Sequence, residues 1–379
     1  MNLEQKVETI LADAGIEING EHLWDVQVPD SSTLRRWALH GSIGLGESYM
    51  DGEWECAALD DMIYRLLAQD PLRSQEPWWY RAMGAALGKV QNFQTIARSF
   101  QVGEHHYDIG DDLYSRMLDP LMTYSCGFWQ AGADELNEAQ EHKLRLTCEK
   151  LGLKPGMRVL DIGCGWGSFC YFAAKHYNVD VVGLTISKEQ QKTAQERCRD
   201  LPVEIRFQDY RTYEGNFDRI VSIGMFEHVG PKNHRAYLEM ARRCLASDGW
   251  FLLHTIGTNR TEAVTRTWYT KYIFPNGYLP SIAEIARAAE HFFVVEDVHN
   301  FGPDYDRTLM AWYARFEANW PELKGTKPEY DDRFYRMWRF YLLSCAAGFR
   351  SRSIQLWQWV LSPNGIAGGY QRPSLTGML

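Results

Sequence analysis

The sequence predicts an α/β fold in which a smaller helical domain precedes a domain built on a mainly parallel sheet. From about residue 145 onward, short β-rich runs alternate with helical segments, a pattern typical of parallel sheets. A glycine-rich turn directly follows the first of these runs. Residues 1 to about 100 instead show the helical spacing of apolar residues. We therefore expect a helical N-terminal domain over 1–100 and a larger domain over 101–379, with an insertion near 258–283.

Composition places the chain among ordinary globular proteins and argues against several kinds of partner. Of its 379 residues 45% are hydrophobic and 23% are charged, and the net charge of −9 argues against nucleic acid as a partner. The eight cysteines form neither a C-x-x-C pair nor a zinc-like spacing, which predicts reduced thiols and no metal site. No apolar run approaches the ~18 residues of a membrane span, and the first residues show no signal region, so we expect a cytoplasmic protein.

The N-terminal domain is expected to consist of helices separated by turns. Apolar residues at helical spacing begin at Leu3, and Gly15 ends this first helix. The glycine-punctuated stretch 41–52 predicts a loop. A further helix is expected over 60–68, closed by Pro71.

The segment 73–100 combines aromatic residues with basic ones on an expected helix. Its cations include Arg81, Lys89 and Arg98, and its only acid is Glu76. This combination suits an anionic membrane surface. An amphipathic helix that docks on the next domain and leaves its cations in water fits the same pattern.

The larger domain is expected to contribute the strands of the sheet. The expected strands are 158–162, 179–184, 203–207, 217–223, 249–255 and 292–299, with a late strand at 308–313. A helix is expected over 168–176, directly after the glycine-rich turn. The aromatic-rich tail over 330–360 is predicted to be helical.

The glycine-rich turn after the first strand is suited to binding a small charged cofactor. Gly163, Gly165 and Gly167 allow the backbone to turn sharply and to approach a ligand closely. The helix over 168–176 would point its free N–H groups at an anion placed there. A tight turn between strand and helix that binds nothing is the simpler alternative.

The spacing within this turn separates two kinds of cofactor. A dinucleotide site would need G-x-G-x-x-G and an acid at the end of the next strand. The turn here reads G-x-G-x-G, and the next strand ends at Thr185 instead of an acid. The run D-x-G-x-G-x-G from Asp161 resembles the first motif of Rossmann-like S-adenosylmethionine (SAM) methyltransferases. In that interpretation Asp161 lies near the SAM ammonium, and amides of the turn face its carboxylate.

Polar residues at the carboxyl ends of the next strands are candidates for the same site, because ligands of open α/β sheets bind there. Thr185 and Gln190 could hold ribose hydroxyls. Asp209 could accept a hydrogen bond from the adenine amine, and Tyr210 could pack on the adenine ring.

Two further polar residues follow buried-looking strands and could serve as acid or base. Glu227 comes directly after the fourth expected strand, and His254 ends the fifth. A solvated loop acid and a satisfied core histidine are the structural alternatives.

Seven pieces of the sequence, in one order, resemble the family of cyclopropane-fatty-acyl-phospholipid synthases and mycolic acid cyclopropane synthases. The pieces are 104–108, 124–126, 159–167, 185–190, 224–230, 254–256 and 274–277. The resemblance runs from about residue 10 to 360. It implies an enzyme that transfers the SAM methyl group to a cis double bond of a phospholipid acyl chain and then closes a three-membered ring.

The resemblance also implies two sets of site residues, carried over motif by motif. The SAM set consists of Tyr124, Ser125, the loop from Val159 to Gly167 (with Asp161, Gly163 and Gly165), Thr185 to Gln190, and Tyr210, joined by Asp209 from the strand-end argument. The bicarbonate set consists of Cys126, Glu227, His254, Ile256 and Tyr305. Cys345 matches a cysteine treated in the family as the active-site thiol.

The chemistry can be tested against these residues. Methyl transfer to an alkene leaves a carbocation, and a proton must leave before the ring closes. A thiolate at Cys345 would be alkylated by the cation, so packing is its favoured role. Bicarbonate held by Glu227, His254 and Tyr305 is the favoured base.

Two other functions remain open from the sequence. An N-methyltransferase of the same fold would use Glu227 or His254 as a base toward an amine and would need no bicarbonate. A SAM-binding regulator without catalysis would have a degraded acid/base set. A lipid substrate further predicts peripheral attachment to the inner face of the membrane through 73–100 or 258–283, and the resemblance implies a homodimer.

Overall fold

The computed structural model describes residues 2–69, 110–261 and 267–374. Their contacts divide the chain into two compact units. The first unit comprises residues 1–91, 262–275 and 305–354, and the second comprises 92–261, 276–304 and 355–379. The first unit thus joins the N-terminal helices to two later segments. The segment 73–100 and the domain boundary expected near residue 100 lie outside the described residues.

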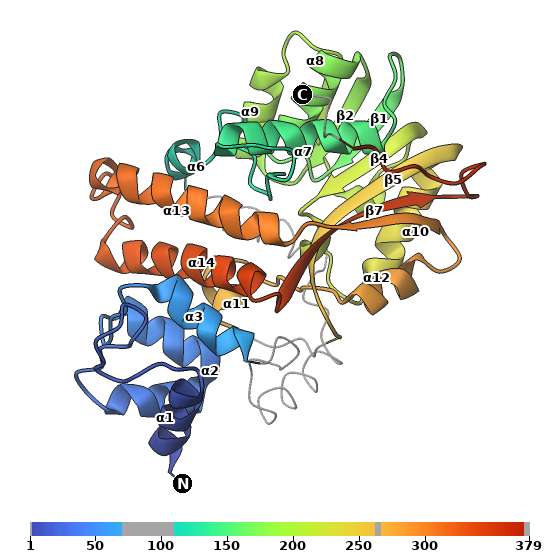
Figure 1. Ribbon diagram of the computed structural model, residues 1–379. Coiled ribbons are helices and arrows are strands. Elements are labelled where there is room, and N and C mark those ends of the chain that lie inside the picture. Colours follow the sequence, from blue (N-terminus) through green and yellow to red (C-terminus); the bar gives the residue numbers. More distant parts are fainter. Residues whose placement is uncertain (1, 70–109, 262–266, 375–379) are drawn as a thin grey trace. The chain divides into compact units, whose positions relative to one another are not determined.

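A seven-stranded sheet forms the centre of the second unit (Figure 1). Its strands are β1 (Arg158–Ile162), β2 (Asp180–Thr185), β3 (Val203–Phe207), β4 (Phe217–Ile223), β5 (Leu245–Thr258), β6 (Val294–Asn300) and β7 (Ile354–Ser362). Their order in the sheet is β3-β2-β1-β4-β5-β7-β6. Strands β1 to β5 pair in parallel, and β6 pairs with β7 antiparallel. The predicted Rossmann-like fold with a mainly parallel sheet is confirmed.

Helices cover both faces of this sheet. They are α7 (Leu136–Lys150), α8 (Ser168–Tyr177), α9 (Lys188–Arg197), α10 (His234–Cys244) and α12 (Ile282–Ala289), with the short α6 (Asp111–Met117) ahead of them. Alternate residues of β1 point to opposite faces, as a strand requires. Val159 packs in a cluster with residues of α7, α8 and α9, whereas Leu160 packs with residues of α10 and α12. The sheet is therefore buried on both sides, which explains its continuous apolar strands.

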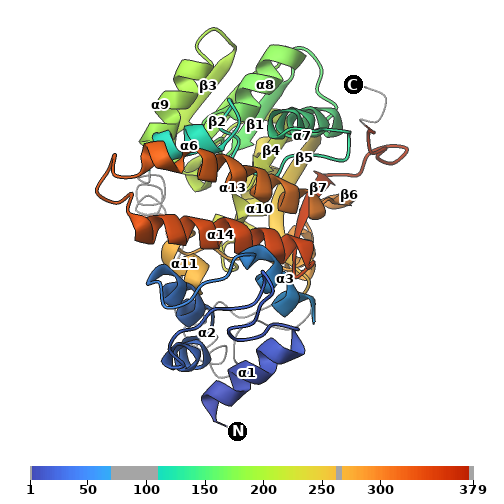
Figure 2. The ribbon, with the colours of Figure 1, turned by 60° about the vertical axis from the view of Figure 1, so that its left-hand side comes forward.

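The first unit is helical. Its helices are α1 (Leu3–Asp13), α2 (Ser32–Met50), α3 (Leu59–Ala68), α11 (Trp268–Tyr272), α14 (Asp332–Arg350) and, from Tyr305 on, α13 (Pro303–Leu323). Figure 2 shows α13 and α14 side by side, with α3 and α2 next to α14. Tyr335 of α14 donates to Glu317 of α13 at 2.7 Å, and Arg350 forms ion pairs with Asp60 at 2.8 Å and Asp306 at 2.9 Å. The expected helices beginning at Leu3 and over 60–68 are confirmed.

Three expectations about local structure were wrong. The stretch 41–52 is not a loop, because α2 runs on to Met50 and only bends at Gly41, where φ is 53°. A Cβ at Gly46 would lie 2.3 Å from Cδ1 of Trp268, so this glycine permits close packing of helices. The stretch 308–313 lies inside α13, and residues 354–360 belong to β7 instead of a helix. Short apolar runs of this kind fit a buried strand and a buried helix equally well.

No helix in the described parts of the chain is both long enough and apolar enough to cross a membrane.

Candidate active site

The turn between β1 and α8 combines two tightly packed glycines with an open one. All three predicted glycines have positive φ, at 86° for Gly163, 54° for Gly165 and 80° for Gly167. A Cβ at Gly163 would lie 2.6 Å from Cγ of Met225, and one at Gly167 would lie 2.9 Å from Cβ of Ala194. A Cβ at Gly165 would meet nothing within 4 Å. The middle of the turn therefore has room for a ligand to approach the backbone.

Only some of the amides in this turn can bind an anion. The amides of Gly163 and Cys164 both donate to the carbonyl oxygen of Leu184 in β2, at 3.0 and 2.9 Å. These two bonds fix the turn against the neighbouring strand. The amide of Gly167 also donates within the turn, to the carbonyl oxygen of Cys164 at 2.9 Å, so anion binding falls to the Gly165 amide and to the first turn of α8.

Asp161 brings a buried carboxyl group to the base of the turn. It lies in the middle of the sheet, opposite Gly183 of β2 and Val221 of β4, and is 2% exposed. Its Oδ2 accepts a hydrogen bond from Sγ of Cys170 at 3.3 Å. Burial raises the pKa of Asp161 to about 7, against the opposing effects of Cys170 and Lys143. A buried carboxyl group without a bound cation gains from a cationic ligand.

The segment with Tyr124, Ser125 and Cys126 is held in place by α7. Nε2 of Gln140 donates to the carbonyl oxygen of Ser125 at 2.7 Å, and Nζ of Lys143 donates to the Ser125 hydroxyl at 2.9 Å. The Tyr124 ring packs edge-on against Tyr114, with centroids 5.1 Å apart. Cys126 is fully buried, and its thiol donates to the carbonyl oxygen of Gly127 at 3.1 Å.

The ends of β2 and β3 bring together the predicted ribose and adenine residues. Oγ1 of Thr185 donates to Oε1 of Gln190 at 3.0 Å. The amide of Gln208 donates to the carbonyl oxygen of Thr185 at 3.0 Å, which places Asp209 and Tyr210 beside this pair. All four of these candidate residues are buried.

The adenine candidates also have partners that sequence reasoning missed. Both carboxylate oxygens of Asp209 accept hydrogen bonds from the Arg211 guanidinium, at 2.8 and 2.7 Å. The Tyr210 ring packs edge-on against Tyr237, with centroids 4.9 Å apart. Asp209 is therefore fixed by its own salt bridge and would receive an adenine amine as an additional donor.

Glu227 and His254 meet at the ends of β4 and β5. The amide of Gly224, which begins the turn leading to Glu227, donates to the carbonyl oxygen of His254 at 2.9 Å. The Glu227 side chain then reaches β5, where its Oε1 accepts from the Ile256 amide at 2.7 Å. Glu227 is 7% exposed and His254 is 1% exposed. Three of the predicted bicarbonate residues are thereby brought together.

Each of these two side chains has one buried atom without a hydrogen-bond partner among the described residues. These atoms are Oε2 of Glu227 and Nε2 of His254. A buried polar group without a partner costs about 1–3 kcal/mol. Burial raises the pKa of Glu227 to about 7 and, with Lys143 and Lys150 adding to the effect, lowers that of His254 well below its ordinary value. The pair is therefore suited to a small polar ligand that can both donate and accept.

Tyr305 and Cys345 belong to the first compact unit. The Tyr305 ring stacks on Phe349, with centroids 4.4 Å apart and an interplanar angle of 19°. Cys345 lies half-buried on α14, and burial raises the pKa of its thiol to about 12. A thiol with that pKa is almost entirely protonated near pH 7, which argues against a nucleophilic role.

Replacing Cys345 by Ala is therefore expected to leave turnover at the same order of magnitude, with a modest loss of thermal stability from the missing packing. Steady-state turnover and thermal unfolding of the variant beside the parent protein check this. Loss of turnover in a Cys345→Ala protein that keeps its fold and its SAM affinity would show that the thiol acts in the reaction.

Helix α7 is the part of the site that sequence reasoning missed. Its buried polar residues recur at helical spacing and form one stripe, namely Gln140, Lys143, Thr147 and Lys150. The spacing of three, four and three residues was a usable signal. The polar stripe was not recognised as part of a site because polar residues on a helix usually face solvent.

Comparisons with known proteins identify the family of this chain. A sequence model of the mycolic acid cyclopropane synthetase family matches residues 94–359. The chain is 53% identical over 361 residues to the cyclopropane-fatty-acyl-phospholipid synthase of Escherichia coli (strain K12), covering 95% of this chain and 93% of that protein. It is 37% identical over 263 residues to cyclopropane mycolic acid synthase 1 of Mycobacterium tuberculosis (strain ATCC 25618 / H37Rv), covering 65% of this chain and 91% of that protein.

Solved structures give the same result. The crystal structure of mycolic acid cyclopropane synthase CmaA1 complexed with SAH and CTAB matches with a TM-score of 0.64 and 35% identity, over 69% of this chain and 97% of that one. Coclaurine N-methyltransferase matches with a TM-score of 0.68 over 84% of this chain and 98% of that one, but at 22% identity it shows the fold alone. The chain therefore belongs to the mycolic acid cyclopropane synthetase family of SAM-dependent methyltransferases.

Proposed function

We propose that this enzyme transfers the methyl carbon of SAM to the cis double bond of an unsaturated phospholipid acyl chain and closes a cyclopropane ring. The proposal is carried by two buried atoms, Oε2 of Glu227 and Nε2 of His254, that have no hydrogen-bond partner in the described parts of the chain. The chain is also 53% identical to a cyclopropane-fatty-acyl-phospholipid synthase. An amine methyltransferase would need one base, whereas this pair offers both an acceptor and a donor. That combination suits a bound oxyanion better than a substrate amine.

The residues of the second unit would hold SAM at the carboxyl end of the sheet. Asp161 would face the ammonium, and the amides at the start of α8 would face the carboxylate. Thr185 and Gln190 would hold the ribose, with Asp209 and Tyr210 around the adenine. An alkene is a weak nucleophile, so holding it in line with the sulfonium methyl is the main catalytic contribution, worth about 7–11 kcal/mol when alignment is good.

The proton that leaves before ring closure needs a base that the carbocation does not alkylate. Bicarbonate, when bound, would supply that base. Glu227 would hold it through Oε2 and His254 through Nε2, near Cys126 and Ile256 of the same compact unit. This assignment fits the orphaned atoms, because a bicarbonate ion has both a hydroxyl to donate and oxygens to accept.

Turnover is accordingly expected to fall about tenfold or more in rigorously carbon-dioxide-free buffer, because a general base contributes at least that much. Adding bicarbonate should restore it, whereas sodium chloride at equal ionic strength should not. Initial rates at saturating SAM measure the effect. A rate that is indifferent to bicarbonate would remove the ion from the mechanism.

The proposed reaction is tested by lipid analysis. Vesicles of cis-unsaturated phospholipid are incubated with protein and SAM, and small amines are offered in parallel. A mass gain of one methylene with loss of the olefin signal supports the proposal. A methyl-branched product would show that the methyl group is transferred to the lipid without ring closure. Methylated amine with unchanged lipid would favour the N-methyltransferase alternative.

We further propose that the protein is cytoplasmic, binds the inner membrane surface peripherally and acts as a homodimer. Of the two candidate segments, 258–283 has two aromatic side chains that already pack against other residues, although Ile282 is 43% exposed. Trp268 is fully buried, and Phe274 packs on Tyr341 with ring centroids 5.6 Å apart. This favours 73–100 as the membrane-binding segment.

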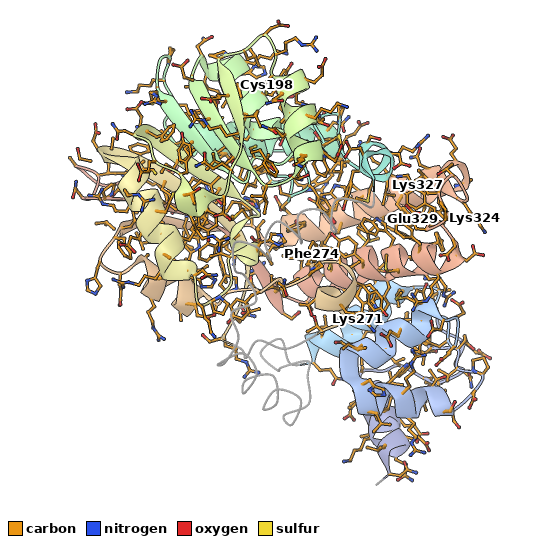
Figure 3. All side chains as sticks on the ribbon, turned by 180° about the vertical axis from the view of Figure 1, so that it is seen from behind. Cys198, Lys271, Phe274, Lys324, Lys327 and Glu329 are labelled. Atoms are coloured by element: carbon orange, nitrogen blue, oxygen red, sulfur yellow. The ribbon has the colours of Figure 1, made fainter. Side chains whose placement is uncertain are left out.

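The membrane proposal predicts that a variant with Arg81, Lys89 and Arg98 all replaced by Gln floats less with anionic vesicles than the parent protein. Each cation near an anionic surface contributes about 1 kcal/mol. A variant with Lys324 and Lys327 replaced by Gln, at the turn between α13 and α14 (Figure 3), is the matched control. Equal flotation of parent and triple variant would reject the basic segment as the anchor.

A further inference from the structure

We infer that Gln358 of β7, oriented by two residues of α7, holds His254 in the neutral tautomer that carries its proton on Nε2. The two orienting residues are Thr147 and Lys150. All four side chains are buried and belong to the second compact unit. Gln358 is thus a positioning residue: it affects the ligand by setting the tautomer of His254.

Thr147 fixes one end of the Gln358 amide. The Thr147 hydroxyl donates its single proton to the carbonyl oxygen of Lys143, one turn earlier in α7, at 2.8 Å. Its oxygen can then only accept from Gln358, which lies 3.2 Å away. This contact favours the amide nitrogen of Gln358 toward Thr147.

Lys150 fixes the other end. Its Nζ donates to Oε1 of Gln358 at 2.8 Å, a contact that requires the amide oxygen on this side. The same Nζ lies 2.9 Å from Nδ1 of His299, so the amine is anchored from two directions. Turning the Gln358 amide over would bring N–H against the amine and leave the Thr147 oxygen facing an acceptor. The two contacts therefore favour the same orientation, and the contact to the protonated Lys150 amine is the stronger of the two.

This orientation determines the state of His254. The nitrogen of the Gln358 amide also lies 3.2 Å from Nδ1 of His254, so its second hydrogen points at that ring nitrogen. A ring nitrogen that accepts a hydrogen bond carries no proton, and the proton of the neutral ring must sit on Nε2. Nε2 is the atom left without a partner in the described structure. His254 therefore presents an N–H donor from β5, the strand whose Ile256 amide also binds the Glu227 carboxylate.

Burying the Lys150 amine and the Gln358 amide costs free energy that a purely structural role would not require. Burial lowers the pKa of Lys150 to about 7, so this amine is held where its charge is disfavoured. A residue needed only for packing at this place would be apolar. The consequence for turnover rests on the proposed function, whereas the tautomer of His254 does not.

The tautomer is measured directly by nitrogen NMR of protein labelled with ¹⁵N-histidine, with the His254 signals assigned by their loss in His254→Gln. The parent protein should show an unprotonated Nδ1 and a protonated Nε2. Gln358→Glu replaces the donor by an acceptor, so Nδ1 should become protonated. Lys150→Met frees the amide to turn over, so a mixture of both tautomers is expected. A protonated Nδ1 in the parent, or identical spectra for parent and Gln358→Glu, would overturn the inference.

Kinetics provide the second readout. Lys150→Met should lower kcat about 10- to 100-fold, the usual loss when the group orienting a site histidine is removed. Its dissociation constant for SAM should be unchanged. Lys154→Met, at an exposed lysine just after α7, is the matched control and should keep full activity. Should Lys150→Met fail to fold, Lys150→Arg keeps a donor toward Gln358 and should retain the parent tautomer.

The two proposals fail in different ways. A parent protein that leaves unsaturated phospholipid unchanged but shows the expected His254 spectrum would refute the proposed reaction and leave the tautomer assignment standing. Normal lipid turnover by Gln358→Glu, with Nδ1 protonated, would show that the tautomer is set as described but has no part in the reaction.

Discussion

Glu227→Gln is expected to lower turnover about 10²- to 10⁴-fold, the range that a general-base system contributes. The substitution keeps an oxygen that accepts from the Ile256 amide. It replaces Oε2, the acceptor proposed to bind the hydroxyl group of bicarbonate, by an NH2 group that can only donate. The affinity for SAM should stay within a factor of about two, because no SAM residue is touched. Single-turnover rates and calorimetric SAM binding measure the two quantities separately.

The same variant should be more stable than the parent protein at alkaline pH. Glu227 has a folded-state pKa of about 7, above its ordinary value of 4.5. Its stabilising contribution is therefore full below about pH 4.5 and is lost as the pH rises toward 7, by about 3 kcal/mol in total. Gln does not titrate, so the gain in melting temperature should be larger at pH 8 than at pH 5.

Glu239→Gln is the matched control, because Glu239 is exposed on α10. It should change neither turnover nor the pH dependence of melting. If Glu227→Gln kept the parent rate, Glu227 would be a structural acid and the bicarbonate assignment would lose its main residue.

The glycine-rich turn and the first strands could be predicted because local chemistry determines them. Gly163, Gly165 and Gly167 all have positive φ, which the predicted sharp turn can adopt because these residues are glycines. Strands β1, β3 and β4 have the expected bounds, since turn residues close each apolar run. In parallel sheets the carboxyl ends of adjacent strands meet, so Thr185, Asp209, Glu227 and His254 could be collected before their contacts were known.

Contacts between segments distant in sequence could not be predicted. Gly46 is a glycine because Trp268, more than two hundred residues later, occupies the space of its missing side chain. Residues 354–362 form a strand because they hydrogen-bond between β5 and β6 in the sheet. The polar residues of α7 look solvated until Ser125 and Gln358 are placed against them. In each case tertiary packing overrides the local preference.

The second large effect is expected at Asp161. Asp161→Asn should weaken SAM binding about 10- to 150-fold at pH 7.5, because a hydrogen bond to a charged group is worth about 1.5–3 kcal/mol. In the parent protein the carboxyl pKa is about 7, so binding an ammonium below that pH requires release of a proton. SAM affinity should therefore rise between pH 5.5 and 7.5, a range in which an α-amino group stays largely protonated. Calorimetry in buffers of different ionisation enthalpy counts the released proton.

The Asn variant should lose both the affinity and most of this pH dependence, because its amide has no proton to release in the range. Asp180→Asn, at the exposed first residue of β2, is the control for an acid-to-amide change on the same sheet. Its SAM affinity should follow the parent curve at every pH. A carboxyl group that contacts the ammonium cannot be replaced by an amide without changing the number of protons released on binding. If Asp161→Asn also followed the parent curve, the Asp161 carboxyl group would therefore not contact the ammonium. Its role would then be the hydrogen bond with Cys170 and packing in the sheet.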